Sequence, residues 1–186
     1  MERIAIVGTT GSGKTTLARR MAERLGCHCC ELDAINWQPN WTQLDADGMV
    51  HRVGPVVGRD RWIIEGNYPS VRPMILKRAD TLLWLDYPFP IVFGRLLWRT
   101  IRRNVTQEDL WSGNRESVRR TLSRESILLW CIQSHRMRRR QYSECVADPA
   151  YAHLKVLRFR HPRELDDWLD SLDPHRGMKP GVNAAA

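Results

Sequence analysis

The chain has 186 residues, of which 42% are apolar and eight are tryptophan, a composition that suits one folded domain and excludes a disordered chain. It has no run of about 18 apolar residues, which excludes a membrane-spanning helix, and its first residues predict a strand rather than a signal peptide, so we expect a cytoplasmic protein. The net charge of +8 is concentrated between residues 95 and 140, where twelve arginines and four acidic residues lie without a lysine.

Apolar runs and helical periodicity divide the chain into alternating strands and helices. In chain order, the predicted elements are a strand at 4–7, a helix at 14–25, a strand at 27–32, a loop at 33–41, a helix at 42–58, a strand at 62–64, a helix at 70–78, a strand at 81–85, a helix at 91–103, a polar and mobile stretch at 104–116, one or two helices at 117–146, a strand at 154–159 and a helix at 163–172. This alternation predicts a three-layer α/β/α fold with a parallel sheet, which collects its ligands at the carboxyl ends of the strands.

Residues 8–16 read GTTGSGKTT and match the pattern G-x-x-x-x-G-K-[ST] at every fixed position, between a predicted strand and a predicted helix. Glycines let successive N–H groups turn inward as an anion-binding nest, and the start of the helix adds its positive dipole end. Lys14 supplies a charge for the β- and γ-phosphates of ATP, and the Thr15 hydroxyl is a suitable ligand for Mg²⁺. The alternative is a chance glycine-rich turn. The expected phosphate contacts are Gly8, Thr9, Thr10, Gly11, Ser12, Gly13, Lys14, Thr15 and Thr16.

This motif makes the expected fold that of a P-loop NTPase, with a five-stranded parallel sheet in the order 2-3-1-4-5 and a helical lid. We expect a single domain over 1–174, with the lid at about 99–120, and a disordered tail at 175–186, because the end of the chain lacks core-forming residues. Neither an N-K-x-D guanine-reading segment nor an LSGGQ-like signature is present, which argues against a GTPase switch and a cassette ATPase. A small-molecule kinase is the class that remains.

Further motifs make the chain resemble a nucleoside or nucleotide kinase of the adenylate-kinase-like superfamily, and more closely the bacterial group of DNA topology modulation proteins. The motifs are GTTGSGKTT, LDAINWQPNW at 32–41, WIIEGNY at 62–68, DTLLWLDYP at 80–88 and LWSGNRES at 110–117. The resemblance spans about residues 3 to 172 and implies the fold and nucleotide chemistry without identifying the phosphate acceptor.

The resemblance also implies where the acceptor binds. Asp33 matches the acid that faces the acceptor hydroxyl in related kinases, where it would act as a base or an orienting group; the alternative is a turn cap. Trp37 and Trp41 would stack on a flat ring, or fill the core. The turn 65–68 resembles the Asp-Gly-Phe-Pro turn of adenylate kinases but departs from it, which argues against AMP as the acceptor. The further candidates are Glu65, which would hold a magnesium-bound water, Asn67 and Tyr68 on that turn, and Arg72, which would clamp an anionic group or lie on the surface.

The arginine-rich segment occupies the lid position of these kinases, where arginines offset the charge of a phosphoryl group in transfer. The four candidates are Arg99, Arg103, Arg115 and Arg119, with the pair 113–114 as a flexible hinge between them. A solvated helix face is the alternative for each of them, and it is the expectation for the arginines at 136–140. Arginine outnumbers lysine 25 to 4 in the whole chain, so overall composition could account for part of the bias. Asp86 is expected to cap the following helix, with a metal role as the alternative.

We therefore predict an ATP- and Mg²⁺-dependent phosphotransferase acting on a small acceptor, a nucleoside or nucleotide. The alternative is a nucleic-acid-associated ATP-binding regulator with slow or no kinase activity, because the whole net charge lies in one basic segment. The two can be told apart by whether the arginines converge on the glycine loop or spread over one outer face.

Overall fold

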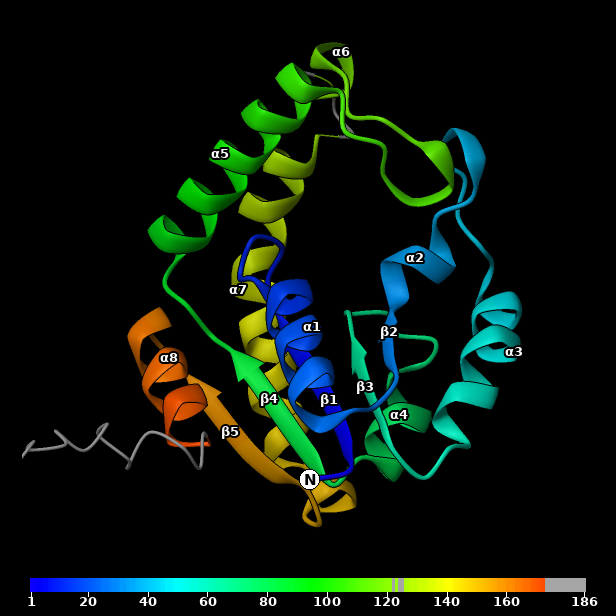
Figure 1. Ribbon diagram of the computed structural model, residues 1–186, viewed down its shortest axis with the longest axis vertical. Coiled ribbons are helices and arrows are strands. Elements are labelled where there is room, and N and C mark those ends of the chain that lie inside the picture. Colours follow the sequence, from blue (N-terminus) through cyan, green and yellow to red (C-terminus); the bar gives the residue numbers. More distant parts are fainter. Residues whose placement is uncertain (122, 124–125, 173–186) are drawn as a thin grey trace, which may run out of the picture.

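A computed structural model describes residues 1–121, 123 and 126–172 of the chain. Its centre is a five-stranded parallel sheet in the order β2-β3-β1-β4-β5, which confirms the predicted fold class and strand order (Figure 1). The strands are β1 (Arg3–Gly8), β2 (Cys29–Glu31), β3 (Trp62–Glu65), β4 (Thr81–Leu85) and β5 (Lys155–Phe159).

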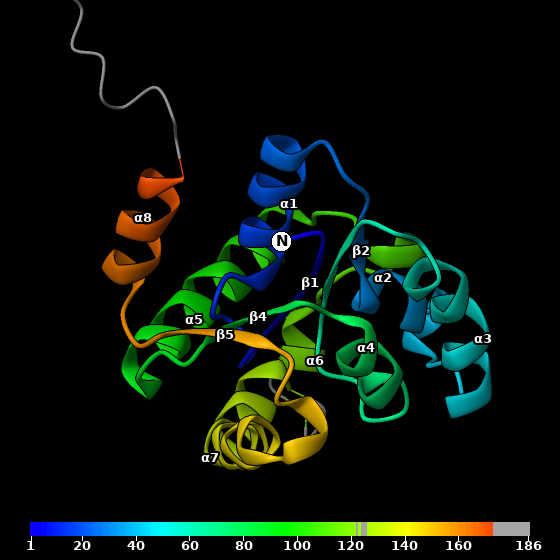
Figure 2. The same ribbon diagram turned by 90° about the horizontal axis from the view of Figure 1, so that it is seen from below.

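Helices cover both faces of this sheet. Seen along the layers, α1 and α8 lie on one side of the strands, and α3, α4 and α7 lie on the other (Figure 2). The helices are α1 (Lys14–Leu25), α2 (Leu32–Asn36), α3 (Ala46–Val57), α4 (Arg72–Arg78), α5 (Phe89–Thr106), α6 (Val118–Thr121), α7 (Ile127–Ala147) and α8 (Pro162–Ser171), with short 3₁₀ turns η1 (Pro39–Trp41), η2 (Trp111–Gly113) and η3 (Pro149–Tyr151). Among these described helices, none has the length and apolar character that a membrane crossing would need.

Side chains alternate between two hydrophobic cores along each inner strand. In β1, Ile4 and Ile6 pack with α1 and α8, whereas Ala5 and Val7 pack with the helices of the opposite face. In β3, Trp62 and Ile64 belong to one core and Ile63 to the other. Because both faces are covered, the residues between the strand ends are apolar on both sides, as expected for a parallel sheet, and the charged Arg3 and Glu65 lie at strand ends.

The first half of the chain departs from the predicted elements after β2. The expected loop at 33–41 is wrong, because Leu32–Asn36 forms α2 and Pro39–Trp41 forms η1. The helix predicted at 42–58 begins later, at Ala46, because the Asp45 side chain accepts a hydrogen bond from the Gly48 N–H (2.8 Å) and fixes the N-terminus there. The five-residue α2 escaped prediction because it is too short to show a helical period.

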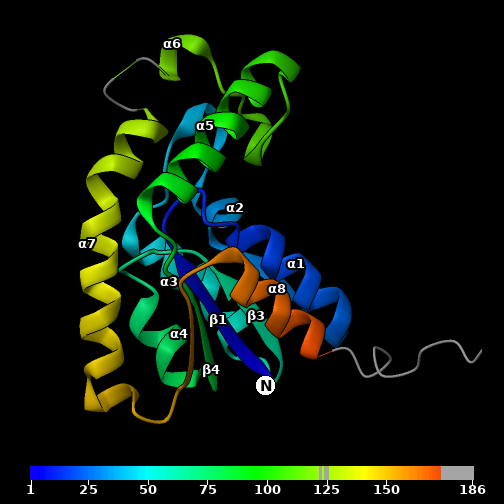
Figure 3. The same ribbon diagram turned by 90° about the vertical axis from the view of Figure 1, so that its left-hand side faces the viewer.

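The second half of the chain builds an arch above the sheet. Helices α5 and α7 rise past the strand ends and α6 lies at their top (Figure 3). The stretch predicted to be polar and mobile follows a defined path: α5 continues to Thr106, and an Asp109–Arg115 bridge then closes a hairpin around η2. The segment predicted as one or two helices forms the two helices α6 and α7. The predicted tail at 175–186 lies outside the described residues.

Candidate functional site

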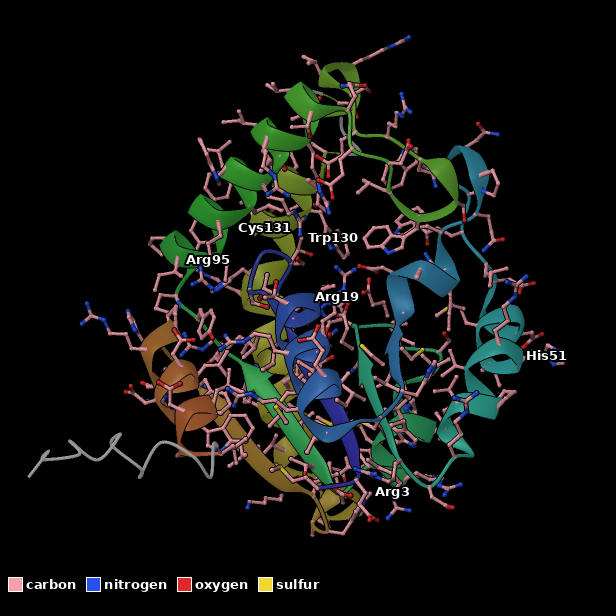
Figure 4. All side chains as sticks on the ribbon, viewed as in Figure 1. Arg3, Arg19, His51, Arg95, Trp130 and Cys131 are labelled. Carbon is pink, nitrogen blue, oxygen red and sulfur yellow. The ribbon has the colours of Figure 1, made fainter. Side chains whose placement is uncertain are left out.

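A cleft of about 1510 Å³ opens at the carboxyl ends of the strands, between the glycine loop and the arch. Its lining comes from the loop before α1, the turns after β2 and β3, and the inner faces of α5 and α7. Arg19 and Trp130 lie at the central opening, and Arg95 approaches the glycine loop from α5 (Figure 4). The parallel topology thus gathers segments from the whole chain at one edge of the sheet.

The glycine loop has the backbone that a phosphate nest requires. Gly11 and Gly13 have φ values of 87° and 93°, in the left-handed region that side chains rarely adopt. A Cβ at Gly11 would lie 2.5 Å from the Val92 carbonyl oxygen, so only glycine fits there. Gly13 precedes α1 and has no side chain to cap it, which leaves the first N–H groups of the helix for an anion.

Lys14 stands at the inner side of this loop. Its Nζ donates to the Thr9 carbonyl oxygen (3.2 Å), so the ammonium is held against the nest. Burial lowers the pKa of Lys14, while the charges of Glu65 and Asp33 act in the opposite direction. A desolvated ammonium between a nest and two acids is well placed to contact the terminal phosphates of ATP.

Thr15 and Glu65 form the part of the cleft that fits Mg²⁺. The Thr15 hydroxyl donates to Glu65 Oε1 over 2.7 Å, from the start of α1 to the end of β3. A hydroxyl and a carboxylate beside a phosphate nest are the hard oxygen donors that Mg²⁺ takes while keeping most of its waters. The described residues contain no group of three His, Cys, Asp or Glu side chains that could hold a metal by themselves. Thr15 and Glu65 therefore fit a Mg²⁺ ion that takes its remaining ligands from phosphate oxygens and water.

The buried carboxyl of Glu65 gives the free protein a defined pH dependence. Burial raises the pKa of Glu65 above its ordinary 4.5, although Lys14 opposes the shift. A glutamate whose pKa is raised on folding destabilises the fold above its folded-state pKa, and this penalty disappears as the pH falls toward the unfolded value. Glu65→Gln keeps an oxygen for Thr15 and removes the charge. We expect it to raise the free energy of unfolding at pH 7 and to have little effect near pH 4.5.

Urea unfolding of wild type and Glu65→Gln across this pH range measures the difference. The exposed Glu23 of α1 provides the matched control, because Glu23→Gln should change stability little at any pH. A Glu65→Gln gain that stayed constant or grew as the pH fell would contradict the assignment.

Asp33 lies across the cleft on α2, where Tyr68 fixes it. The Tyr68 hydroxyl donates to Asp33 Oδ1 (2.6 Å), and burial, followed by the charge of Asp33, raises the pKa of Tyr68. Asn67 is held on both sides: its amide donates to the Gly8 carbonyl oxygen (2.7 Å) and accepts from the Tyr142 hydroxyl (2.7 Å). Asn67 therefore ties the turn after β3 to the glycine loop and to α7. Asp33, Asn67 and Tyr68 all line the cleft.

Three arginines that line the cleft have no carboxylate partner among the described residues: Arg95, Arg99 and Arg138. Arg99 Nε is buried without a hydrogen-bond acceptor, and burial lowers the pKa of Arg99, with Arg103 adding to the effect. Burial also lowers the pKa of Arg138, whose Nη1 donates to the Gln141 Oε1 (3.2 Å). Arg95 is exposed, whereas Arg99 and Arg138 are partly buried. Guanidinium groups without a carboxylate partner in one cleft are suited to bind phosphate or carboxylate oxygens.

Two of the four predicted lid arginines line the cleft and two do not. Arg99 and Arg103 line the cleft, and Arg103 pairs with Glu116 at 3.3 Å. Arg115 and Arg119 are exposed and do not line the cleft, and Arg115 pairs with Asp109 at 2.6 Å. Arg72 does not line the cleft: its guanidinium packs over the Tyr142 ring, 5.5 Å from the centroid.

Sequence reasoning missed Arg95 and Arg138. The expectation that all arginines at 136–140 form a solvated face is wrong for Arg138, which is half-buried and lines the cleft. Arg95, Arg99 and Arg103 repeat every four residues on α5, so helical spacing could have found Arg95. Arg138 stands four residues after Ser134, another cleft residue on α7. Without the packing of α7, nothing in the sequence distinguishes that side from the other faces.

Four tryptophans line the cleft: Trp37, Trp41, Trp111 and Trp130. Trp37 and Trp41 meet edge to face with their ring centroids 5.4 Å apart, and neither ring belongs to the two hydrophobic cores. The alternative that they fill the core is therefore wrong. Trp130 is 44% exposed on α7, and the Arg138 guanidinium lies 6.0 Å from its ring centroid.

Asp86 belongs to the scaffold beside the cleft. Its Oδ2 accepts from Arg158 Nη2 (2.6 Å) and pairs with Arg139 Nε (3.2 Å), joining the end of β4 to β5 and α7. The predicted helix cap is wrong, because the N-cap of α5 is Pro88 and no side chain caps the helix. Through its ion pair with Arg139, the buried Asp86 carboxylate holds α7 against the end of β4, next to Arg138.

No family model and no curated protein sequence matches the chain. Among solved structures, shikimate kinase from Acinetobacter baumannii in complex with shikimate is 17% identical, covers 92% of this chain and 92% of its own, and has a TM-score of 0.55. Shikimate kinase from Bacteroides thetaiotaomicron is 16% identical, with 92% and 96% coverage and a TM-score of 0.52. A gluconokinase from Sinorhizobium meliloti 1021 is 16% identical, with 92% and 93% coverage and a TM-score of 0.49. The likeness to the two shikimate kinases shows that the chain shares their three-layer α/β/α fold.

Proposed function

We propose that this chain is an ATP- and Mg²⁺-dependent phosphotransferase that phosphorylates a small acceptor. The observation that carries the proposal is the convergence of Lys14, Asp33 and the unpaired Arg99 on one cleft beside the glycine loop. When bound, ATP would supply the phosphoryl group, and Mg²⁺ would offset its negative charge. The contribution of the chain is then positioning and electrostatic stabilisation, which is what phosphoryl transfer requires of a protein.

The donor phosphates would be held by the glycine loop and the first turn of α1. Lys14 would contact the terminal phosphates, and Thr15 and Glu65 would hold the metal ion through the oxygens that now share a hydrogen bond. Arg99 would offset charge on the transferred group from the arch side. Arg95, whose guanidinium lies near Gly13 and over the Tyr87 ring, would contact the donor from the same direction.

The acceptor would bind against Asp33, on the side of the cleft opposite Arg99. Asp33 would orient the acceptor hydroxyl and accept its proton, as a general base within hydrogen-bond reach. Tyr68 would hold Asp33 in place through the 2.6 Å hydrogen bond to Oδ1, which leaves Oδ2 for the acceptor.

The walls of this region indicate what kind of acceptor fits. Trp37, Trp41 and Trp130 offer faces for a flat ring, and Arg138 offers an unpaired cation for a negative group. A nucleoside or nucleotide would use the rings, and the unpaired Arg138 favours an acceptor that also carries phosphate or carboxylate.

The position of the arginines favours the kinase over a nucleic-acid-binding regulator. Arg95, Arg99 and Arg138 converge on the cleft, as the kinase requires. We also propose membership of the DNA topology modulation group, for which the motifs at 32–41, 62–68, 80–88 and 110–117 are the support.

A screen of ATP consumption over nucleosides, nucleotides and other small hydroxyl compounds tests the proposal. We expect one class of acceptor to speed ATP consumption in the presence of Mg²⁺ and product analysis to find the acceptor phosphorylated. Thermal-shift measurements with the same compounds would detect binding without turnover. Steeply salt-dependent DNA binding together with no acceptor in the whole screen would contradict the kinase and support the regulator.

A further inference from the structure

Two loops that lie more than 60 residues apart in the chain meet above the cleft with the same backbone shape. The acceptor loop, residues 37–43, is closed by a Trp37–Gln43 bridge, and the lid hairpin, residues 109–115, by an Asp109–Arg115 bridge. Asn40 in the first and Ser112 in the second have φ values of 59° and 56° with ψ of 30° in both. Figure 1 shows the tip of the hairpin against the acceptor loop, closing the arch.

The Asn114 side chain joins the two loops. Its Oδ1 accepts from the Trp41 N–H (2.9 Å), and its Nδ2 donates to the Gln38 carbonyl oxygen (2.9 Å) and to the Trp111 carbonyl oxygen (2.8 Å). Two of these three bonds cross between the loops, and all three go to backbone. The side chain is buried, with 5% of Asn114 exposed, so Asn114 is anchored in this conformation, and the hinge predicted at 113–114 stays a prediction.

Further hydrogen bonds surround Asn114 in the same contact. The Ser112 hydroxyl donates to the Trp37 carbonyl oxygen (2.7 Å), and the Trp41 indole donates to the Arg115 carbonyl oxygen (3.3 Å). The Trp111 indole reaches Glu31 Oε2 at the end of β2 (3.4 Å). The lid hairpin is thus hydrogen-bonded to the segment that carries the candidate acceptor wall. None of these bonds involves a residue of the glycine loop.

We propose that Asn114 is a positioning residue that makes the acceptor loop and the lid hairpin close as one unit. An amide supplies both an acceptor and two donors at one point, which this arrangement of one N–H and two carbonyl groups requires. Closing the lid then sets Trp37 and Trp41 in place as the acceptor wall, and opening it releases them. The description of this wall as an acceptor site rests on the proposed function, but the coupling of the two loops does not.

Amide hydrogen exchange of the full chain, followed by NMR without any ligand, tests the coupling. The informative probe is the Gln38 N–H, which donates to the Thr42 carbonyl oxygen inside its own loop and makes no bond to Asn114. Asn114→Asp removes both donors and keeps the shape. We expect exchange at the Gln38 N–H and in the lid hairpin to become about 10-fold faster, because the Gln38 carbonyl oxygen loses the bond from Nδ2 and then faces a carboxylate oxygen. Exchange in β1 and β3 should stay unchanged.

Asn40→Asp is the matched control, the same chemical change at the tip of the acceptor loop. Asn40 is exposed, and aspartate tolerates its left-handed backbone, so exchange in both loops should stay as in wild type. Faster exchange in the lid hairpin alone, or no change in either loop, would overturn the proposal.

If Asn114→Asp loosens the sheet as well, Ser112→Ala decides, because it deletes only the bond to the Trp37 carbonyl oxygen. Faster exchange in both loops would then support the coupling, and a purely local change would refute it. The experiment needs no acceptor or turnover. If the loops are coupled but the protein phosphorylates none of the tested compounds, this inference stands and the proposed function is rejected.

Discussion

Lys14→Ala is expected to lower kcat/KM for ATP-dependent transfer roughly 10²- to 10³-fold while the protein stays folded, since removing one preformed charge contact to a transferring group costs about that much. Lys14 is the one lysine among the described residues that line the cleft, and its ammonium already lies against the Thr9 carbonyl oxygen at 3.2 Å. The unpaired arginines of the cleft belong to other elements, Arg95 and Arg99 to α5 and Arg138 to α7, so none of them is part of the loop. The substitution removes a cation that burial disfavours, and this gain opposes the loss of the Lys14 charge beside Glu65, so we expect the protein to stay folded.

A coupled assay of ATP consumption with the acceptor found by the screen measures this loss, and calorimetry with MgATP measures the accompanying loss of affinity. Lys77→Ala is the matched control, because Lys77 is exposed on α4, away from the cleft. Unchanged turnover in Lys14→Ala, with thermal unfolding as in wild type, would rule out the assigned phosphate site.

Arg138→Met is expected to weaken acceptor binding by roughly 10- to 150-fold, the usual range for losing a hydrogen bond to a charged group. Arg138 is half-buried, has no carboxylate partner among the described residues and stands over the Trp130 ring. Methionine keeps the length and apolar part of the side chain and removes the charge. We expect KM for the acceptor to rise and KM for ATP to stay near its wild-type value.

Arg136→Met is the control on the same helix, because Arg136 is exposed and outside the cleft. Initial rates over a grid of ATP and acceptor concentrations separate the two KM values. A rise in KM for ATP alone would place Arg138 on the donor side, and no change in either constant would remove it from the site. Phosphorylation of uncharged acceptors by the wild type as fast as of acceptors with a phosphate or carboxylate group would contradict the preference for a negative group.

The sheet and the glycine loop could be predicted because their signals are local. Each strand is a short apolar run, and GTTGSGKTT specifies backbone shape, charge and hydroxyl within nine consecutive residues. Strand order followed from that motif, since the motif identifies the fold, and the structure confirms the order.

The arch could be predicted only in outline, because its chemistry depends on contacts between distant segments. Arg115 and Arg138 have the same side chain in the same basic segment, yet one pairs with Asp109 on the surface and the other lines the cleft. Among the arginines of α7, the rotation of the helix about its axis decides which one faces the cleft, and the Asp86 to Arg139 ion pair helps to set that rotation. Asn114 looked like part of a flexible loop because its three backbone partners are not marked in the sequence.

The close approach at Gly11 links the floor of the cleft to the root of the arch. The Val92 carbonyl oxygen and the Leu96 Cβ, both on the first turns of α5, would lie 2.5 and 3.0 Å from a Cβ at this glycine. The glycine loop therefore rests directly on the helix that carries Arg95, Arg99 and Arg103. A methyl group at Gly11 would push α5 away from the loop. The absence of a side chain at Gly11 therefore sets the distance between the loop and the arginines of α5.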